Sequence, residues 1–223
     1  AFLRTQFAGA VAVVNLVGIL NERGDNGRGF QRAHLELTQL ALDACTATDV
    51  TRYLHMSALN AAADAPSHYL RSKAAAEARV NAAPGLHATI FGPGDGLFAR
   101  FDALTAFAPV LPLACAAARF QPVYVGDVAD AFVRALPDRA TFGQSYDLGG
   151  PQVMTLLEIV RYALQQRGRR RLVVPLGPGL SRLMAGVMEH LPGKPFSRDN
   201  LRSASLDSVL NFSSSNSRRP KCA

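Results

Sequence analysis

Apolar runs and amphipathic stretches alternate along most of this chain. Continuous apolar runs at about residues 10–17, 52–57 and 86–91 are typical of strands that are buried on both faces of a parallel sheet. Between them, residues 29–47 and 67–82 place apolar side chains at helical spacing. This alternation predicts an α/β fold with a doubly wound parallel sheet.

The second half of the chain continues the alternation in shorter pieces. Strands are predicted at 119–125, 145–148 and 171–176, and helices at 97–107, 126–136, 156–167 and 180–191. Asp127 is predicted to cap one of these helices, and Thr155 and Glu158 have the spacing of a capping box. One apolar stripe, which we expect to pack in the core, consists of Leu180, Leu183, Met184, Val187, Met188 and Leu191.

Length and composition narrow the class of protein. With 223 residues and 48% hydrophobic residues, the chain can form one domain with a sizeable core and a small second lobe. Its three cysteines are far apart and odd in number, which predicts neither a disulfide framework nor a metal site and favours a reducing compartment. Residues 5–21 are uncharged but short and partly polar, so we interpret them as containing a buried strand rather than a membrane span.

The net charge of +7 comes largely from two basic clusters, at 167–171 and 217–221. The simpler interpretation is a solvated helix end and a loose tail. The alternative is contact with an anionic membrane surface or a partner, whereas no nucleic-acid-binding motif is present. Residues 211–223 are polar and lack a pattern, which predicts a disordered tail.

Candidate chemistry lies at the end of the second predicted strand. That strand ends near Ser57, and the helix predicted from residue 67 carries Tyr69 and Lys73 one turn apart on one face. Ligands of parallel sheets bind outside the carboxyl ends of the strands, so the three side chains can share a site. A nearby ammonium lowers the pKa of a phenol, which would let Tyr69 transfer a proton at neutral pH. The alternative is that Tyr69 packs, Lys73 is solvated and Ser57 caps a turn.

Several segments in order resemble the short-chain dehydrogenase/reductase superfamily, in its extended, epimerase-like branch. They are VVNLVGIL (13–20), SAL (57–59), YLRSK (69–73), QPVYVGDVADAF (121–132) and YDLGG (146–150). Together with His34 in the first long helix, they most resemble the branch that contains the NADPH-binding accessory subunit of respiratory complex I and its bacterial relatives. For His34 itself we expect a packing role.

The resemblance implies a Rossmann-like fold that binds NADP or NAD. It implies that Tyr69 is the acid/base, Lys73 binds the ribose and Ser57 contacts the substrate oxygen. The cofactor would also pass along residues of the first strand end, namely Asn15, Leu16, Val17 and Gly18. The implied function is an oxidoreductase or epimerase acting on a sugar or small alcohol. The alternative is a non-catalytic nucleotide-binding structural or assembly protein of complex I.

Two departures from the family pattern change these expectations. No G-x-x-G-x-x-G motif precedes residue 13, and the glycines at 24–29 follow a different strand. The chain begins at Ala1, so we expect a fragment without the first βαβ unit, which binds the dinucleotide weakly. Second, the family's R-P-x-x-x-F-G segment is shortened near residue 91, which implies an incomplete nicotinamide pocket.

From the resemblance we also predict how the chain is divided. Residues 1–118 would form a partial dinucleotide-binding domain and residues 119–210 a substrate lobe, with the tail following from residue 211. The expected location is cytoplasmic, at the periphery of an inner membrane.

Overall fold

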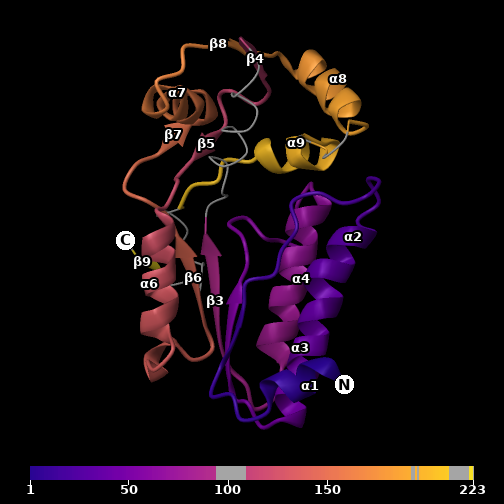
Figure 1. Ribbon diagram of the computed structural model, residues 1–223, viewed down its shortest axis with the longest axis vertical. Coiled ribbons are helices and arrows are strands. Elements are labelled where there is room, and N and C mark those ends of the chain that lie inside the picture. The colour runs from indigo at the N-terminus through magenta and orange to yellow at the C-terminus, as the bar shows by residue number, and fades with distance from the viewer. Residues whose placement is uncertain (94–108, 192–193, 195, 211–220, 223) are drawn as a thin grey trace.

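The largest sheet of the molecule is parallel and lies between two layers of helices (Figure 1). The computed structural model describes residues 1–93, 109–191, 194, 196–210 and 221–222. Within these residues, the strands of the sheet run in the order β1-β2-β3-β6-β9, and each neighbouring pair is parallel. Their bounds are β1 Val13–Asn15, β2 Arg52–Met56, β3 His87–Pro93, β6 Gln144–Leu148 and β9 Lys221–Cys222.

Helices cover both faces of this sheet, which confirms the predicted doubly wound α/β fold (Figure 1). The helices of this part are α1 Phe2–Phe7, α2 Arg28–Phe30, the π-helical turn η1 Gln31–Glu36, α3 Leu37–Ala47, α4 His68–Ala82 and α6 Val125–Ala135. The predicted helix at 29–47 is therefore continuous, but its π-helical part differs from a regular α-helix. The short helix α1 was not predicted from the sequence.

The two faces of the sheet form separate cores. On one face, Tyr53 and Ile90 pack with Leu42 of α3 and Val80 of α4. On the other face, Leu54 packs in a cluster with Phe91 and with Val128 and Phe132 of α6. Neighbouring residues of a strand point to opposite faces, so β2 contributes to both cores. Full burial of each such large side chain stabilises the fold by roughly 1.5–3 kcal/mol.

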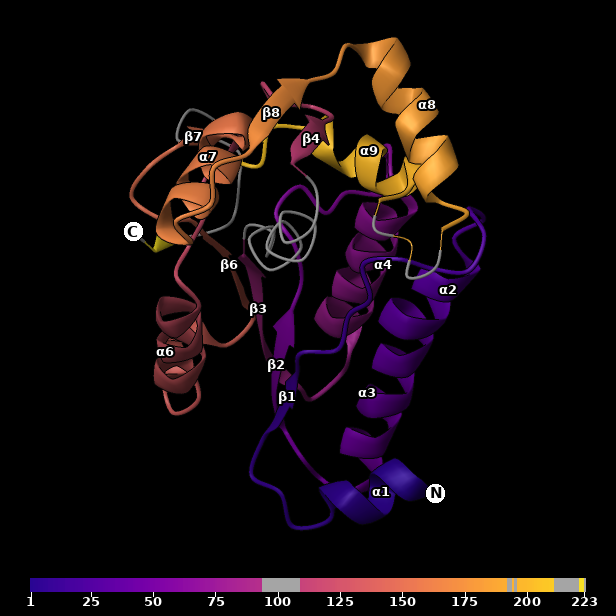
Figure 2. The ribbon, with the colours of Figure 1, turned by 45° about the horizontal axis from the view of Figure 1, so that its top comes forward.

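A smaller lobe lies beyond the carboxyl ends of the central strands (Figure 2). It contains the parallel pair β4 Val110–Leu113 and β8 Leu172–Pro175, and the antiparallel pair β5 Arg119–Phe120 and β7 Met154–Thr155. The helices that follow β6 are α7 Leu156–Gln166, α8 Pro178–Met188 and α9 Arg198–Ala204, and the 3₁₀ turn η2 Arg139–Thr141 precedes that strand. Leu111, Phe120, Ile159 and Val160 form the core of this lobe.

Two predicted helix starts had different outcomes. The capping box is confirmed, because Thr155 Oγ1 accepts the N–H of Glu158 and the Glu158 carboxylate accepts the N–H of Thr155. The prediction that Asp127 caps α6 is wrong. The helix begins at Val125 with Tyr124 in the capping position, so Asp127 lies in the first turn, where a negative charge still favours the helix dipole.

The apolar stripe on α8 does not pack in the core as expected. Leu180, Leu183 and Val187 are 59%, 64% and 57% exposed. Instead, Ser181 and Ala185 are the buried residues of this helix. The small side chains therefore face the interior, Met184 and Met188 are half-buried, and the exposed apolar surface consists of Leu180, Leu183, Val187 and Leu191.

Strand β3 is regular despite the shortened family segment. It continues through Gly92 and Pro93, which pair with Asp147 and Leu148 of β6. The strand predicted at 119–125 is shorter, because it ends before Pro122, which has no N–H to donate. The helix predicted at 97–107 and most of the predicted tail lie outside the described residues. The division of the chain at residue 118 stays a prediction.

Among the described helices, none has both the length and the apolar composition that crossing a membrane requires.

Candidate functional site

Strand β2 and helix α4 bring the three predicted catalytic side chains to the carboxyl end of the sheet. Ser57 follows β2 directly, and its N–H donates to the carbonyl of Phe91 at 2.6 Å. Helix α4 starts at His68 because Ser67 caps it, with its Oγ accepting the N–H of Leu70 at 3.2 Å. This start places Tyr69 in the first turn and Lys73 one turn later, and both side chains are buried.

The ammonium of Lys73 connects α4 to two strand ends. Its Nζ donates to the carbonyl oxygen of Met56 at 3.0 Å and to that of Val17 at 3.4 Å. A Cβ atom added at Gly18 would lie 3.3 Å from Nζ, so the glycine allows the loop after β1 to pass close to the lysine. Lys73 thus lies beside the loop that leaves β1.

Asn15 is engaged inside the protein rather than directed at the sheet end. Its Nδ2 donates to Tyr53 Oη at 2.9 Å and to Thr38 Oγ1 at 3.2 Å. Its Oδ1 accepts the N–H of Val17 at 3.0 Å. Asn15 thus shapes the chain as it leaves β1, whereas Leu16 and Val17 expose their side chains. As cofactor-binding residues, Asn15, Leu16, Val17 and Gly18 stay predictions.

Ser57 carries a buried hydroxyl that has no hydrogen-bond partner within the described residues. A buried hydroxyl without a partner costs free energy, so such groups are uncommon outside sites that bind water or a ligand. The Ser57 hydroxyl can therefore form a hydrogen bond with a ligand or a water molecule.

His34, for which we expected only a packing role, also makes two hydrogen bonds. Its Nε2 accepts the N–H of Ile19 at 3.0 Å, and its Nδ1 lies 2.8 Å from Ser72 Oγ. The ring packs edge-on against Tyr69, with 5.5 Å between ring centroids. Burial, followed by the charge of Lys73, lowers the pKa of His34 to about 3. His34 is therefore a neutral residue that fixes the loop after β1 against α4.

His55 is a second buried histidine near this site, and the sequence reasoning missed it. It is 1% exposed, and neither ring nitrogen has a hydrogen-bond partner within the described residues. Burial, then the charge of Lys73, then His34 lowers the pKa of His55 to about 3. A histidine in an otherwise apolar strand sequence was the signal available.

The glycine-rich loop after β1 binds a carboxylate of its own chain. The N–H groups of Gly27 and Gly29 donate to Glu22 Oε1 and Oε2 at 2.6 and 2.7 Å. Gly27 has a φ of +79°, which favours glycine, and it starts α2. These donors are already used, which agrees with the expectation that residues 24–29 are not the family's phosphate-binding loop.

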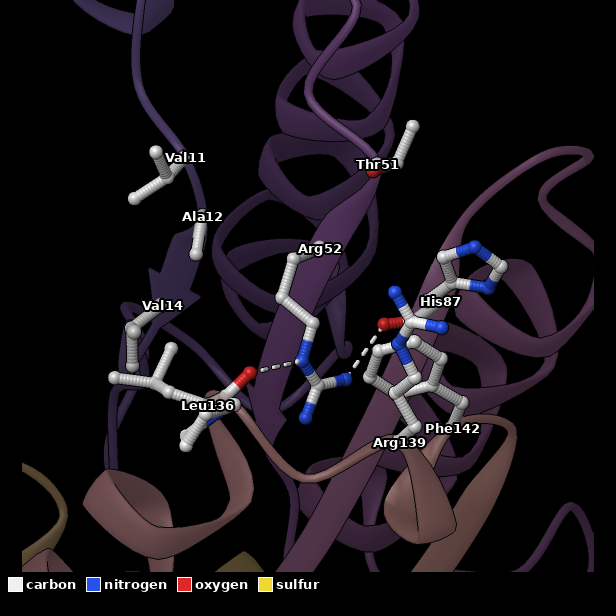
Figure 3. Close-up of a pocket in the computed structure, with 10 residues that line it drawn as sticks. Val11, Ala12, Val14, Thr51, Arg52, His87, Leu136, Arg139 and Phe142 are labelled. Atoms are coloured by element: carbon white, nitrogen blue, oxygen red, sulfur yellow. Dashed lines mark hydrogen bonds between the residues drawn. The ribbon is translucent and has the colours of Figure 1, made fainter.

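A cavity of about 940 Å³ lies at the opposite end of the strands from Ser57 (Figure 3). It is lined by Val11, Ala12, Val14, Thr51, Arg52, His87, Leu136, Pro137, Arg139 and Phe142. The guanidinium of Arg52 donates to three carbonyls and two hydroxyls, those of His87, Ala135, Leu136, Thr89 and Thr141. All five of its donors are used, so Arg52 has a structural role and the cavity contains none of the predicted site residues.

Asp25, His68 and Asp199 are the candidate metal-ligating cluster within the described residues, with one ligand atom of each within 4.8 Å of the others. However, Arg202 donates to both carboxylates. The guanidinium of Arg71 also lies 3.0 Å from Nδ1 of His68. The ligand atoms already face cations, so the cluster is an ion-pair network.

Comparison with known proteins identifies the relatives of this chain. No protein-family model matches it. The mitochondrial NADH dehydrogenase [ubiquinone] 1 alpha subcomplex subunit 9 of Arabidopsis thaliana is 33% identical over 218 residues, which cover 93% of this chain and 53% of that protein. The chain is a homologue of these NADH dehydrogenase subunits. The subunit 9 of Mus musculus is 31% identical over 173 residues, covering 74% of this chain and 45% of that protein. The chain thus spans about half the length of the subunit 9 relatives it matches.

Solved structures support the fold of the subunit 9 homologue. MoeE5 in complex with UDP-glucose and NAD has a TM-score of 0.68 at 17% identity, over 79% of this chain and 69% of that one. A dTDP-glucose 4,6-dehydratase, DesIV from Streptomyces venezuelae, has a TM-score of 0.63 at 20% identity, over 80% and 65% of the two chains. The predicted Rossmann-like fold is therefore confirmed.

Proposed function

We propose that this chain holds the nicotinamide-ribose end of NADP or NAD at the carboxyl end of β2. We propose further that it serves as a nucleotide-binding subunit or assembly protein of a respiratory NADH dehydrogenase. The position of Lys73 carries the proposal, because its ammonium lies against Gly18 and between the ends of β1 and β2. An ammonium in this position can donate to the hydroxyls of a ribose.

The chemistry of the surrounding residues fits such a ligand. Ser57 offers a buried hydroxyl without a partner in the described residues, and Gly18 allows close approach of the backbone. Among the proteins of similar fold, MoeE5 was solved with NAD and the RMD protein of Pseudomonas aeruginosa with NADPH. When bound, the nicotinamide would supply or accept a hydride.

The partner would be a membrane-bound respiratory complex, because the relatives are named as mitochondrial NADH dehydrogenase subunits. The exposed stripe of α8 is the surface that we propose for this contact. Residues 159–188 contain six arginines and no acidic residue, so this stretch of α7 to α8 favours an anionic partner surface. The substitution Leu183→Glu would then prevent co-purification with the complex. Release of the wild-type chain by salt alone, with no effect of Leu183→Glu, would contradict this contact surface.

Titration of the chain with NADPH and with NADH tests the binding proposal. We expect the ring resonances of Tyr69 to shift as cofactor is added. The shifts should saturate at or below a cofactor concentration in the millimolar range, and NADPH should not be consumed. No change at several millimolar of either cofactor would refute the binding site.

A second candidate function is an oxidoreductase or epimerase that acts on a sugar or small alcohol. The observation in its favour is that Lys73 Nζ binds the carbonyl of Met56 next to Ser57, while Tyr69 packs in one cluster with Ala58. Ser57 would orient a substrate oxygen, and the proton of a substrate hydroxyl would pass to Tyr69. Turnover that Tyr69→Phe abolishes without loss of cofactor binding would support this candidate over the first.

A further inference from the structure

The first turn of α4 is capped from a distant part of the chain. Asp199 of α9 is 3% exposed, and its Oδ1 accepts the N–H of His68 at 2.7 Å. Its Oδ2 accepts the N–H of Tyr69 at 3.1 Å. With Ser67 Oγ on Leu70, the first three N–H groups of the helix are therefore satisfied by side chains. The negative charge also complements the positive end of the helix dipole.

Arg202 extends this cap to the loop that follows β1. Its guanidinium donates to Asp199 Oδ1 at 3.0 Å and to Asp25 Oδ2 at 3.2 Å. Asp25 belongs to the same loop as Gly18, which passes Lys73. One arginine thus connects the carboxylate that caps α4 with a carboxylate of the loop after β1.

Further hydrogen bonds hold the same loop against Lys194 and Asn200. Lys194 Nζ donates to the carbonyl of Glu22 at 2.8 Å, and Asn21 Nδ2 donates to the carbonyl of Lys194 at 2.8 Å. Asn200 Nδ2 donates to the carbonyl of Leu20 at 2.9 Å. The segment around α9 therefore contacts both α4, which carries Lys73, and the loop after β1, which passes beside it.

We propose that Asp199 and Arg202 are positioning residues for the site formed by Tyr69 and Lys73. The proposal rests on the proposed function of that site. Asp199 holds the backbone of Tyr69 itself, and Arg202 couples this turn to the loop that would border the ribose. Neither residue contacts the ligand. They set the distance between α4 and the loop, so that the smaller lobe determines whether the nucleotide site is assembled.

The substitution Asp199→Asn tests the proposal, because it keeps the side-chain size but removes the charge and one acceptor. Asp207→Asn is the matched control. Asp207 also accepts a backbone N–H and pairs with a guanidinium, both from Arg119, but it touches neither α4 nor the loop. Two quantities are measured on the full chain labelled with ¹³C-tyrosine. One is the ring resonance of Tyr69, assigned by its absence in Tyr69→Phe, and the other is the dissociation constant for NADPH.

We expect Asp199→Asn to shift the Tyr69 resonance in the absence of ligand and to weaken NADPH binding about tenfold. Asp207→Asn should leave the resonance in place and the dissociation constant within about twofold. If Asp199→Asn only lowers the melting temperature, with the Tyr69 resonance and NADPH affinity unchanged, Asp199 is an ordinary helix cap and the proposal is wrong.

Two further outcomes remain informative. If the wild-type chain binds no NADPH, the proposed function fails, but the Tyr69 resonance in the free protein still tests the positioning role. If Asp199→Asn does not fold, Arg202→Gln takes its place, because it keeps the Asp199 carboxylate at the start of α4 and removes the guanidinium that joins Asp199 to Asp25. A Tyr69 resonance and an affinity that Arg202→Gln leaves unchanged would overturn the coupling.

Discussion

The Nζ atom of Lys73 lies 3.0 Å from the carbonyl oxygen of Met56, the last residue of β2 and the neighbour of Ser57. This hydrogen bond places the lysine at the point where the strand ends and the loop begins. Lys73 is only 4% exposed there. The lysine is thus ordered by the backbone before any ligand binds, which lowers the entropic cost of using it in a binding site.

Lys73→Met should weaken NADPH binding at least about tenfold, because a charge-assisted hydrogen bond is lost. The methionine has a similar length, so the helix should still pack. Calorimetric or NMR titration measures the change. Arg134→Met, at an exposed position on α6, is the control for the loss of one positive charge. Equal affinities of the two variants would show that Lys73 does not contact the ligand.

Gly18→Ala should move the ammonium of Lys73, because the added Cβ would lie 3.3 Å from Nζ. Since the lysine can shift by a few tenths of an ångström, we expect a loss of NADPH affinity of about threefold and a change in unfolding free energy below about 1 kcal/mol. Gly179→Ala, where nothing lies within 4 Å of the new Cβ, is the control. The contact would be unimportant if both variants bind NADPH equally well.

Acid should destabilise the fold through its two buried histidines. The pKa of both His34 and His55 falls from 6.5 to about 3 on folding, so between these values the unfolded chain binds more protons than the folded one. The contribution of each histidine to the free energy of unfolding is fully present above about pH 6.5. It is lost as the pH falls toward 3, at up to about 1.4 kcal/mol per pH unit for each histidine.

The substitution His55→Leu isolates one of these contributions. When the pH falls from 6.5 to 5, the unfolding free energy of His55→Leu should decrease by about 2 kcal/mol less than that of the wild type. At pH 7 it should be neutral or stabilising, because it removes two buried nitrogens without partners. Urea denaturation at each pH provides the measurement, and His190→Leu is the control at an exposed position. An unchanged acid slope in His55→Leu would mean that this ring is protonated in the folded protein.

Arg52→Met should lower the unfolding free energy by at least about 3 kcal/mol, because it removes five hydrogen bonds, three to carbonyls and two to hydroxyls. Chemical denaturation measures this loss. Arg139→Met removes an exposed arginine from the same cavity and should change stability by less than about 0.5 kcal/mol. If both variants have a similar unfolding free energy, the Arg52 hydrogen bonds make no net contribution to stability.

The sequence predicted the elements whose signals are local. The run before Ser57 and the helix with Tyr69 and Lys73 have nearly the expected bounds, because burial and helix propensity act within a few residues. The capping box at Thr155 was found for the same reason. The contact of Asp199 with the start of α4 was not predictable, because Asp199 is separated from Tyr69 by 130 residues.

The exposed stripe of α8 was misjudged for a related reason. Periodicity shows that one face of a helix is apolar, but it does not say which face meets the core. Ser181 and Ala185 allow α8 to lie close to its neighbours, and this packing preference is invisible in a count of large apolar side chains. For buried His55 the one signal was its place in an otherwise apolar strand sequence, which the sequence reasoning did not use.

The carboxylate of Glu22 bound by Gly27 and Gly29 acts as a tethered competitor. Because only a few residues join it to the amides that it binds, its effective concentration at the loop reaches the millimolar range or higher. A free phosphate group at lower concentration cannot displace it. Below that concentration of free phosphate the loop therefore keeps one shape, and Lys73 and α4 are the parts of the site left to respond to the nucleotide.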